Sequence, residues 1–457
     1  MFTACLRYLI KMAIKYCAFL DNIVKPEVTL NGDRVVQARV VNQVGEIPTA
    51  TVLIKPEDAI KYTSPDQELQ LKISNTPGAG LLFKGYLSGV NFSNMSGNIS
   101  AGVDIIHKAR DLQETSSVVP GVSKSGNAEM ETILYRDKKK IMEGQSGAYQ
   151  KFDINKPFPE AICTGIIDWL NSVKTTQIPK SRAGEKDKAI SMLSWIASNS
   201  TDMGKFFAPD LIDRVCKFCS NILERSHISS DIWDVLSIII GSFDATLVCM
   251  PDGRIIMTPN FCGVSASGND VQSEIIQKMD RSCQIKRSPK ECVIMSNVCL
   301  YSVKNEPTRC AVAQSVDENP GSRGSLLVSA PGWCSDIDSK KGADLAQRGM
   351  DSLSKAILYR EAHKTRTFNI VTPICRSAVP GTCATFIPAS GVKNFNGQPI
   401  DIFEEKFDGY CYKVEHILDV ESWTTIFHFQ ACVEESSGIK KLSNHPLFPD
   451  AKMIKWD

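Results

Sequence analysis

The first part of the chain alternates short apolar runs with polar turns. Between about residues 15 and 115, runs rich in Val, Ile, Leu and Thr are separated by clusters such as Asn31-Gly32-Asp33 and Thr76-Pro77-Gly78. Short strands joined by tight turns are typical of a β-barrel or a β-sandwich. We therefore expect strands at residues 35–41, 49–54, 69–73, 81–90 and 99–106.

Between about residues 126 and 240 the apolar spacing becomes helical. Ile162, Ile166, Trp169 and Leu170 fall on one face of a helix expected at 158–173. The same spacing predicts a second helix at 211–223. This part of the chain is therefore predicted to be mainly helical.

A connecting region of mixed character follows. Ser229-Ser230-Asp231 predicts the N-cap of a helix at 232–240, and Pro251-Asp252-Gly253 predicts the turn of a β-hairpin. After it we expect strands at 291–303, 309–316 and 325–329, a helix at 341–361, and a second group of strands at 365–372, 382–387, 410–417 and 423–432.

Two of the predicted hairpins, at residues 85–105 and 409–429, align without a gap. Each begins at a glycine, where the missing Cβ permits a bend or a close backbone approach, and each ends in a strand with alternating apolar positions. The matched positions are Gly85 with Gly409, Tyr86 with Tyr410, Val90 with Val414, Ile99 with Trp423, Val103 with Phe427, and Ile105 with Phe429. We infer two similar β-modules near the two ends of the chain.

These patterns predict an α+β, mainly β fold. It has two similar tube-type β-barrel domains, which flank a helical insert and a small α/β connecting domain. The predicted division is an N-terminal extension at 1–14, barrel I at 15–120, the helical insertion at 121–228, the connecting domain at 229–362, barrel II at 363–433, and a C-terminal tail at 434–457.

Composition narrows the possible partners. The chain has 457 residues, with 52 Lys and Arg against 51 Asp and Glu. So balanced a charge gives no overall field that would hold nucleic acid or an anionic membrane, so we expect no specific nucleic-acid binding. The 16 cysteines are scattered through a chain that is large enough to fold without disulfides, so we expect free thiols.

The N-terminal residues are apolar, but Arg7, Lys11 and Lys15 interrupt them, and no stretch approaches the length of a membrane span. The chain is therefore expected to be made in the cytoplasm of its host. Its functional start is either Met1 or Met12, because a strand-like run begins just after Met12.

Signatures of catalysis are nearly absent. Phe83 occupies the third glycine position of a dinucleotide fingerprint, and there is no phosphate-binding loop, nucleophile elbow or zinc-protease motif. We therefore predict no enzymatic activity and no catalytic, cofactor or metal site.

Three sets of polar residues leave open a metal site or a catalytic site. Cys216 and Cys219, with His227 nearby, could begin a zinc site, but there is no second close Cys pair and their helical spacing favours a structural role. His416 and His428 are expected on a polar or interface face of a strand, with a shared catalytic role as the alternative. Glu143 and Asp168 could form a carboxylate pair for glycoside cleavage.

Several segments resemble one family. They are KGYLSGV at 84–90, NISAGVDII at 98–106, SSVVPG at 116–121, DIWDVL at 231–236, DGRIIMTP at 252–259, GYCYKVEH at 409–416 and WTTIFHF at 423–429. Together they resemble the two barrels and the connecting domain of baseplate hub proteins from contractile-tailed bacteriophages, the late control protein D and VgrG-like group. The region from 126 to 225 matches least, and the high cysteine content departs from the family.

This resemblance implies a structural virion protein of the tail baseplate. Three copies would form a pseudo-sixfold ring that joins the hexameric tail tube to the trimeric central spike and leaves a channel for the genome. The implied partners are the tail tube protein and the central spike protein, with the tape measure and baseplate wedge proteins as further candidates. The two matched hairpins would then form the ring.

Two other functions remain open. One is a tail-tip or host-binding component of a non-contractile tail, and the other is a hub that carries a cell-wall hydrolase in residues 121–228. Adhesion to cells would indicate the former. Cell-wall cleavage that is lost on carboxylate substitution would indicate the latter.

Overall fold

The computed structural model of the protein describes twenty stretches or single positions of the chain. These are residues 27–74, 80–95, 98–114, 118–122, 128–132, 156–172, 180–200, 231–241, 245–259, 280–285, 291–298, 309–316, 325–329, 351, 354, 358, 366–376, 378–386, 407–419 and 423–434.

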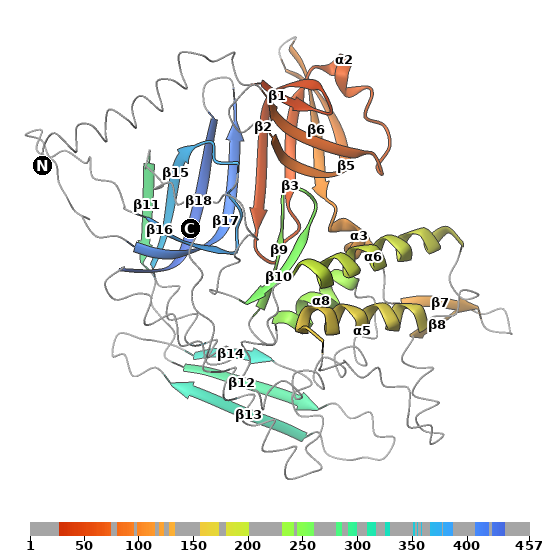
Figure 1. Ribbon diagram of the computed structural model, residues 1–457, viewed down its shortest axis with the longest axis vertical. Helices are drawn as coiled ribbons and strands as arrows, with labels where there is room; N and C mark the ends of the chain where they lie inside the picture. The colour runs from red at the N-terminus through yellow and green to blue at the C-terminus, as the bar shows by residue number, and fades with distance from the viewer. Residues whose placement is uncertain are drawn as a thin grey trace, which may run out of the picture.

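The first β-module is a closed, six-stranded antiparallel barrel (Figure 1). Its strands follow the order β1-β4-β5-β6-β3-β2, and pairing of β1 with β2 closes the circle. The barrel confirms the mainly β prediction for this part of the chain. Its strands are β1 (Glu27–Leu30), β2 (Asp33–Gln43), β3 (Thr49–Ile54), β4 (Glu68–Ser74), β5 (Gly80–Met95) and β6 (Asn98–His107).

Alternating side chains fill the barrel interior, as a period of two requires. In β3, for example, Ala50, Val52 and Ile54 are buried, whereas the residues between them are more exposed. The other interior residues include Leu30, Val40, Leu69, Leu71, Phe83, Leu87, Val103 and Ile105. This apolar core is the main source of the stability of the barrel.

Asn31 and Gly32 form the two-residue turn between β1 and β2. Both have positive φ, 48° and 98°, as a type I′ hairpin turn requires. Asn31 also accepts a hydrogen bond from the backbone N–H of Gln70 at 2.8 Å, and its amide donates to the Glu68 carbonyl at 3.1 Å. The turn is thereby fixed to the neighbouring strand β4.

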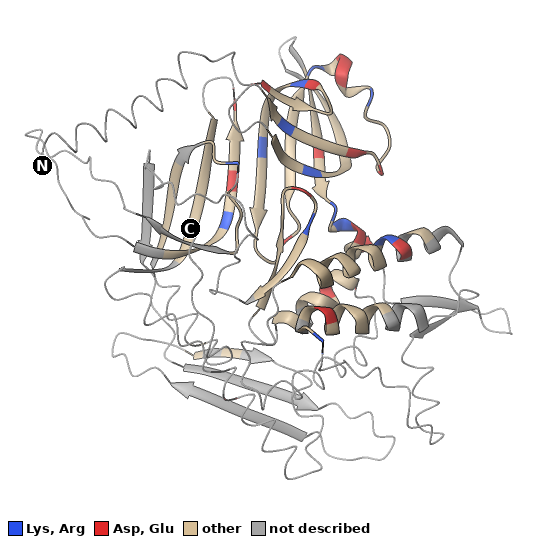
Figure 2. Cartoon of the chain, viewed as in Figure 1, with Lys and Arg blue, Asp and Glu red and all other residues tan. Residues whose placement is uncertain are grey.

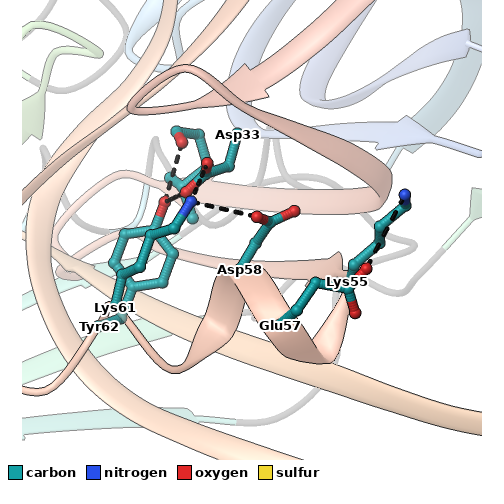
Figure 3. Close-up of polar contacts among 7 residues, drawn as sticks. Asp33, Lys55, Glu57, Asp58, Lys61 and Tyr62 are labelled. Carbon is teal, nitrogen blue, oxygen red and sulfur yellow. Dashed lines mark hydrogen bonds and ion pairs between the residues drawn. The ribbon is translucent and has the colours of Figure 1, made fainter.

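A short helix, α2 (Pro56–Ala59), follows β3 and is tied to the same turn (Figure 3). The Lys61 ammonium lies 2.8 Å from Asp33 and 3.1 Å from Asp58, and the Tyr62 hydroxyl lies 2.8 Å from the other Asp33 oxygen. Burial, together with the Asp33 carboxylate, raises the pKa of Tyr62 above its usual value. These contacts hold the crossover between β3 and β4 against the end of the barrel.

The second β-module contains five strands in the order β16-β17-β18-β15-β11. Its core comprises Phe368, Ile370, Ala378, Cys411, Val414, Phe427 and Phe429. The strands are β11 (Asp280–Ile285), β15 (Arg366–Pro373), β16 (Thr382–Phe386), β17 (Phe407–Leu418) and β18 (Trp423–Glu434). A closing sixth strand is not among the described residues, so the second barrel stays a prediction.

The two modules repeat the same topology in the same chain order. Strands β2, β3, β4, β5 and β6 correspond to β11, β15, β16, β17 and β18, and corresponding neighbours pair antiparallel. An additional segment that includes β12 to β14 stands between β11 and β15, where the first module has the short turn between β2 and β3. The predicted repeat therefore extends well beyond one hairpin.

The two hairpins have the same register from Tyr86 and Tyr410 onward, whereas β17 has a further irregularity at Gly409 that β5 lacks at Gly85. Val90 pairs with Val103 as Val414 pairs with Phe427, and each first strand has a β-bulge, at Ser88 in β5 and at Tyr412 in β17. The other matched pairs are Tyr86 with Ile106 and Tyr410 with Gln430, Leu87 with Ile105 and Cys411 with Phe429, Gly89 with Asp104 and Lys413 with His428, and Asn94 with Ile99 and Leu418 with Trp423.

Helices and small sheets lie between the modules in the chain and also between β11 and β15 (Figure 1). Helices α5 and α6 pack together, and α6 also contacts α3 below the barrel. The Asp231 carboxylate accepts a 2.7 Å hydrogen bond from the Asp234 N–H, which confirms the predicted N-cap. The remaining elements are α3 (Arg110–Glu114), β7 (Val118–Val122), β8 (Ala128–Thr132), α5 (Phe158–Ser172), α6 (Lys180–Asn199), α8 (Ile232–Gly241), β9 (Ala245–Cys249), β10 (Ile255–Pro259), β12 (Glu291–Val298), β13 (Arg309–Val316) and β14 (Ser325–Ser329).

Several details differ from the sequence expectations, among them β1 and α6, which were not expected as separate elements. The stretch 128–132 is a strand paired with 118–122, whereas helical character was expected from 126 onward. Strand β11 was not predicted, and it pairs with β15 although its residues fall in the predicted connecting domain. Because β11 lacks a clear alternating pattern, only its long-range partner identifies it. The domain boundaries themselves stay a prediction, and the predicted helix at 211–223 lies outside the described residues.

Gly85 provides a direct test of the close approach that was predicted at the start of the hairpin. A Cβ on Gly85 would lie 2.1 Å from the backbone oxygen of Ile106, whereas one on Gly102 of the same hairpin would meet nothing closer than 3.8 Å. We expect Gly85→Ala to lower the free energy of unfolding by roughly 2 kcal/mol or more, because backbone must move. Gly102→Ala should change it by less than about 1 kcal/mol. Equal effects in chemical denaturation would contradict this account.

Candidate functional site

The two β-modules are joined edge to edge within one chain. Residues 38–43 of β2 pair antiparallel with residues 413–418 of β17, from Ala38 opposite Leu418 to Gln43 opposite Lys413. Figure 1 shows β2 and β17 side by side at the junction. We call this pairing the internal seam. It satisfies main-chain groups that each module would otherwise leave exposed on an edge strand.

Apolar packing continues across the internal seam. Leu418 of the second module belongs to the core cluster of the first barrel, and Ile374 and Trp423 pack against that cluster. The Trp423 indole N–H donates to the Asp419 carbonyl at 3.1 Å, which fixes the ring at the end of the second hairpin. The modules therefore share hydrophobic contacts as well as strand hydrogen bonds.

A buried carboxylate lies at the internal seam. Glu415 is 2.8 Å from the Arg39 guanidinium, 2.6 Å from the Lys413 ammonium and 3.2 Å from His428 Nε2. Burial alone would raise the pKa of Glu415, but hydrogen bonds from Lys413 and Arg39 outweigh it and hold the pKa at about 2. The charge of Glu415 thus links a strand of each module near neutral pH.

The hairpin β9–β10 lies beneath the seam and contacts the first module at two strand ends. Asn42 donates a buried 2.8 Å hydrogen bond to the Cys249 carbonyl, and the Gly45 N–H donates to the Leu247 carbonyl at 2.8 Å. His107, at the end of β6, has Nε2 2.9 Å from the Met250 carbonyl and accepts from the Ala109 N–H at Nδ1. Because Met250 offers only an acceptor, Nε2 must carry the proton.

The same hairpin also contacts the second module. Val248, Met250 and Ile256 form one cluster with Val379, and Val44 packs against it. The Gly381 N–H donates to the Cys411 carbonyl at 2.8 Å, and a Cβ on Gly381 would lie 2.5 Å from the Val248 side chain. The hairpin therefore helps to set how the modules sit relative to each other.

Most of the predicted ring residues lie in the module cores or at their margins. Gly85, Val103, Gly409, Tyr410, Val414 and Phe427 are buried, whereas Tyr86, Val90 and Trp423 are partly buried. Ile99 pairs with Asn94 at the end of its hairpin. Among them, Val414 and its neighbours on β17 pair across the internal seam. A role of the hairpins in a ring stays a proposal.

The two histidines of the last hairpin lie close to the seam. His416 is buried in the half of β17 that pairs with β2, and its Nδ1 lies 3.0 Å from the Thr425 hydroxyl. His428 has Nδ1 2.9 Å from Asn369 and faces Glu415 through Nε2. This arrangement accounts for both histidines by packing and pairing.

The other candidate residues are largely outside the described part of the chain. Cys216, Cys219, His227 and Glu143 all lie there, and Asp168 is described only as a backbone position in α5. Within the described residues, no three His, Cys, Asp or Glu side chains group as metal ligands. A search of the same residues finds no helix that could span a membrane. The predictions about metal and hydrolase activity therefore stay open.

Charges of both signs are interspersed over the described strands and helices (Figure 2). This distribution agrees with the near balance of acidic and basic residues in the whole sequence.

The residues that make the seam, such as Arg39, Asn42 and Glu415, were not singled out from the sequence. An acidic residue within an apolar strand run was the one available signal for Glu415, since a buried charge requires partners from elsewhere in the chain.

The contacts of Glu415 with Arg39, Lys413 and His428 should contribute to the stability of the fold. We expect Glu415→Gln to lower the free energy of unfolding by roughly 1–3 kcal/mol, because Arg39 and Lys413 lose their shared partner. Lys55→Ala is the matched control, since the Lys55–Glu57 pair is 3.9 Å long and both side chains are more than 60% exposed (Figure 3). The control should change stability by less than about 0.5 kcal/mol in the same denaturation assay. Similar losses in both variants would contradict a seam role for Glu415.

The buried histidines predict a loss of stability in mild acid. Burial lowers the pKa of His107 and of His416 to about 4, against 6.5 when unfolded. The unfolded chain therefore binds more protons below pH 6.5, so stability falls as the pH drops toward 4. At pH 5 the loss should be about 2 kcal/mol for each histidine relative to pH 7.

Thermal unfolding at pH 7 and pH 5 tests this expectation. His107→Gln keeps a donor and an acceptor at this position but cannot titrate, so it should show a smaller difference in Tm between the two pH values. His416→Gln should behave in the same way. If both variants lost as much as the unsubstituted chain, other groups would be responsible.

Comparison with known proteins gives structural likenesses only. No protein-family model matches the chain, and no curated protein matches it. Among solved structures, a tail protein from Neisseria meningitidis MC58 is similar, with 11% identity, a TM-score of 0.44, and coverage of 93% of this chain and 98% of that one.

Two further solved structures are similar over most of their length. The 43 kDa tail protein of prophage MuSo2 from Shewanella oneidensis has 9% identity, a TM-score of 0.42, and coverage of 94% of this chain and 99% of that one. The prophage tail protein gp18 from Listeria monocytogenes EGD-e has 9% identity, a TM-score of 0.39, and coverage of 89% and 92%. The chain is thus similar in structure to phage tail proteins, at a level that by itself assigns no function.

Proposed function

We propose that the chain is a structural subunit of a phage tail, the hub of a baseplate. Three copies form a pseudo-sixfold ring that joins a hexameric tail tube to a trimeric central spike and leaves a channel for the genome. The observation that carries the proposal is the repeated five-strand unit, whose two copies stand edge to edge in one chain.

The repeat supports a ring for a geometric reason. The internal seam joins unlike edges of two similar modules, because β2 belongs to one end of the five-strand order and β17 lies near the other. A contact between unlike edges can be repeated from module to module, and it closes into a ring when the rotation allows. Two modules per chain then give six modules from three chains.

The many contacts at the internal seam also favour a structural role. The strand pairs, the shared apolar cluster and the β9–β10 hairpin fix the modules to each other from three sides. A junction held in this way would keep the shape of the proposed ring. A tail, rather than another ring assembly, is proposed because of the segments at 84–90, 231–236, 252–259 and 409–416 that resemble baseplate hub proteins.

The partners and location follow from the same proposal. The ring contacts the tail tube protein on one side and the central spike protein on the other, with the tape measure and wedge proteins as further neighbours in the virion. Near-balanced charge is compatible with DNA that passes through the channel without being held.

Native mass measurement tests the proposed ring. The purified full-length chain should have the mass of three copies at micromolar concentration, or should reach it when tube and spike proteins are added. Electron microscopy of that assembly should show six similar densities around a central hole. A chain that stays monomeric under all of these conditions would overturn the proposal, and cleavage of cell walls by the pure chain would favour the hydrolase alternative.

A further inference from the structure

The repeat identifies which free edges match the two sides of the internal seam. Strand β11 is the counterpart of β2, and β5 is the counterpart of β17. The internal seam joins β2 of the first module to β17 of the second. Each chain therefore carries the other two halves of an equivalent seam, on β5 of the first module and β11 of the second.

Both of these edges lack a partner among the described residues. Strand β11 ends the order of the sheet. Strand β4 pairs only with residues 80–86 of β5, so the outer edge of β5 has no described strand partner from Gly89 to Asn94. Strand β17 shows the same division, because β16 pairs with residues 407–411 and β2 pairs with residues 413–418.

Strand β17 is buried where β2 covers it, whereas the matched part of β5 is open. Glu415 and His416 are buried on β17, but their counterparts Asn91 and Phe92 on β5 are exposed. Phe92 is 58% exposed, whereas its counterpart His416 is 3% exposed. An exposed phenylalanine on a long edge strand is a site where a further strand is expected to add.

We propose that β11 of one copy pairs antiparallel with β5 of the next copy and repeats the internal seam between subunits. Transferring the register of the internal seam through the repeat places Val90 opposite Ile285, Asn91 opposite Gln284, Phe92 opposite Cys283, Ser93 opposite Ser282, and Asn94 opposite Arg281. This inference rests on the proposed ring and specifies its contact. The occupant of each edge is a second copy of this chain.

The geometry of the chain fits a head-to-tail contact. The barrel strand β5 and the edge strand β11 lie on opposite sides of the internal seam (Figure 1). One copy therefore presents its β11 edge outward while its β5 edge remains available to another. Repetition of this contact buries every such edge only when the ring closes.

The two seams differ in charge. At the internal seam Arg39 and Glu415 form an ion pair, whereas Ser282 and Asn91 occupy the matched positions of the proposed seam. Asn91 instead donates a 2.9 Å hydrogen bond to Asp104 of its own hairpin. The contact between copies therefore has no ion pair at these positions. It depends on main-chain pairing and on the burial of Phe92.

Disulfide trapping tests the register directly. Opposed residues on paired antiparallel strands have Cα atoms about 4.5–5.5 Å apart, which lies within the range of about 4.4–6.8 Å that disulfides span. Under mild oxidation, the Ser93→Cys/Ser282→Cys double variant should give a covalent trimer. A mixture of the two single variants should stop at covalent dimers, because each chain then carries one introduced thiol and can link to only one neighbour. Peptide mass mapping must find the introduced thiols at positions 93 and 282 joined to each other, which separates this link from the native cysteines.

Two cysteine pairs serve as controls. Arg39→Cys/Ile417→Cys places the same pair in the internal seam, so it should form a link within one chain in any assembly state. Asn91→Cys/Asp280→Cys uses the proposed strands four residues out of register and should not link. A three-copy assembly in which the internal control links but positions 93 and 282 do not would overturn the seam while leaving the ring intact. Absence of any three-copy assembly would overturn both.

A charge on the exposed edge gives an independent readout that needs no oxidation. Phe92→Asp should leave Tm of the isolated chain nearly unchanged but reduce the three-copy population at least tenfold, because the seam would bury a carboxylate. Val36→Asp is the control, since Val36 is 50% exposed on β2 outside the seam residues. A Phe92→Asp chain that assembles as well as the control would contradict the inference.

Discussion

Main-chain pairing between β2 and β17 is the contact on which the arrangement of the protein depends. Among the described residues, positions 38–43 of β2 and 413–418 of β17 have no other strand on that side within their own modules, so they would otherwise expose unpaired N–H and C=O groups. Their pairing joins the two modules into one continuous sheet. The Glu415 cluster, the shared position of Leu418 and the hairpin β9–β10 are all placed around this pairing, so they stabilise a contact that the backbone defines.

The bulges explain how one strand can serve two neighbours. In β17 the irregularity at Tyr412 separates the half that pairs with β16 from the half that pairs with β2, and in β5 the one at Ser88 stands at the same place. A bulge adds local twist and bend to a strand. Each module can therefore complete its own sheet with one half of the strand and offer the other half to an adjacent module.

The repeated strands and the segments inserted between them contribute different parts of the structure. The repeated strands carry the sheet edges that a ring requires, whereas the segments between them carry the helices and the small sheet of β12, β13 and β14. Among the described elements, the hairpin β9–β10 supports the junction directly, through Asn42, His107 and Gly381. Insertions into such loops alter the surface without changing the register of the sheet, because loops tolerate added residues better than strands do.

The sequence alone determined the local elements and the repeat of the hairpins. Short apolar runs predicted β3, β13 and β14 with their observed ends, Asp231 predicted the cap of α8, and Gly85 predicted a close backbone approach. Tertiary structure decided which strands meet. The pairing of β2 with β17 and of β11 with β15 joins residues far apart in the chain, and such pairing depends on backbone groups that every residue carries. For the same reason, the partners of Glu415 became evident only when Arg39 was brought beside it from the other module.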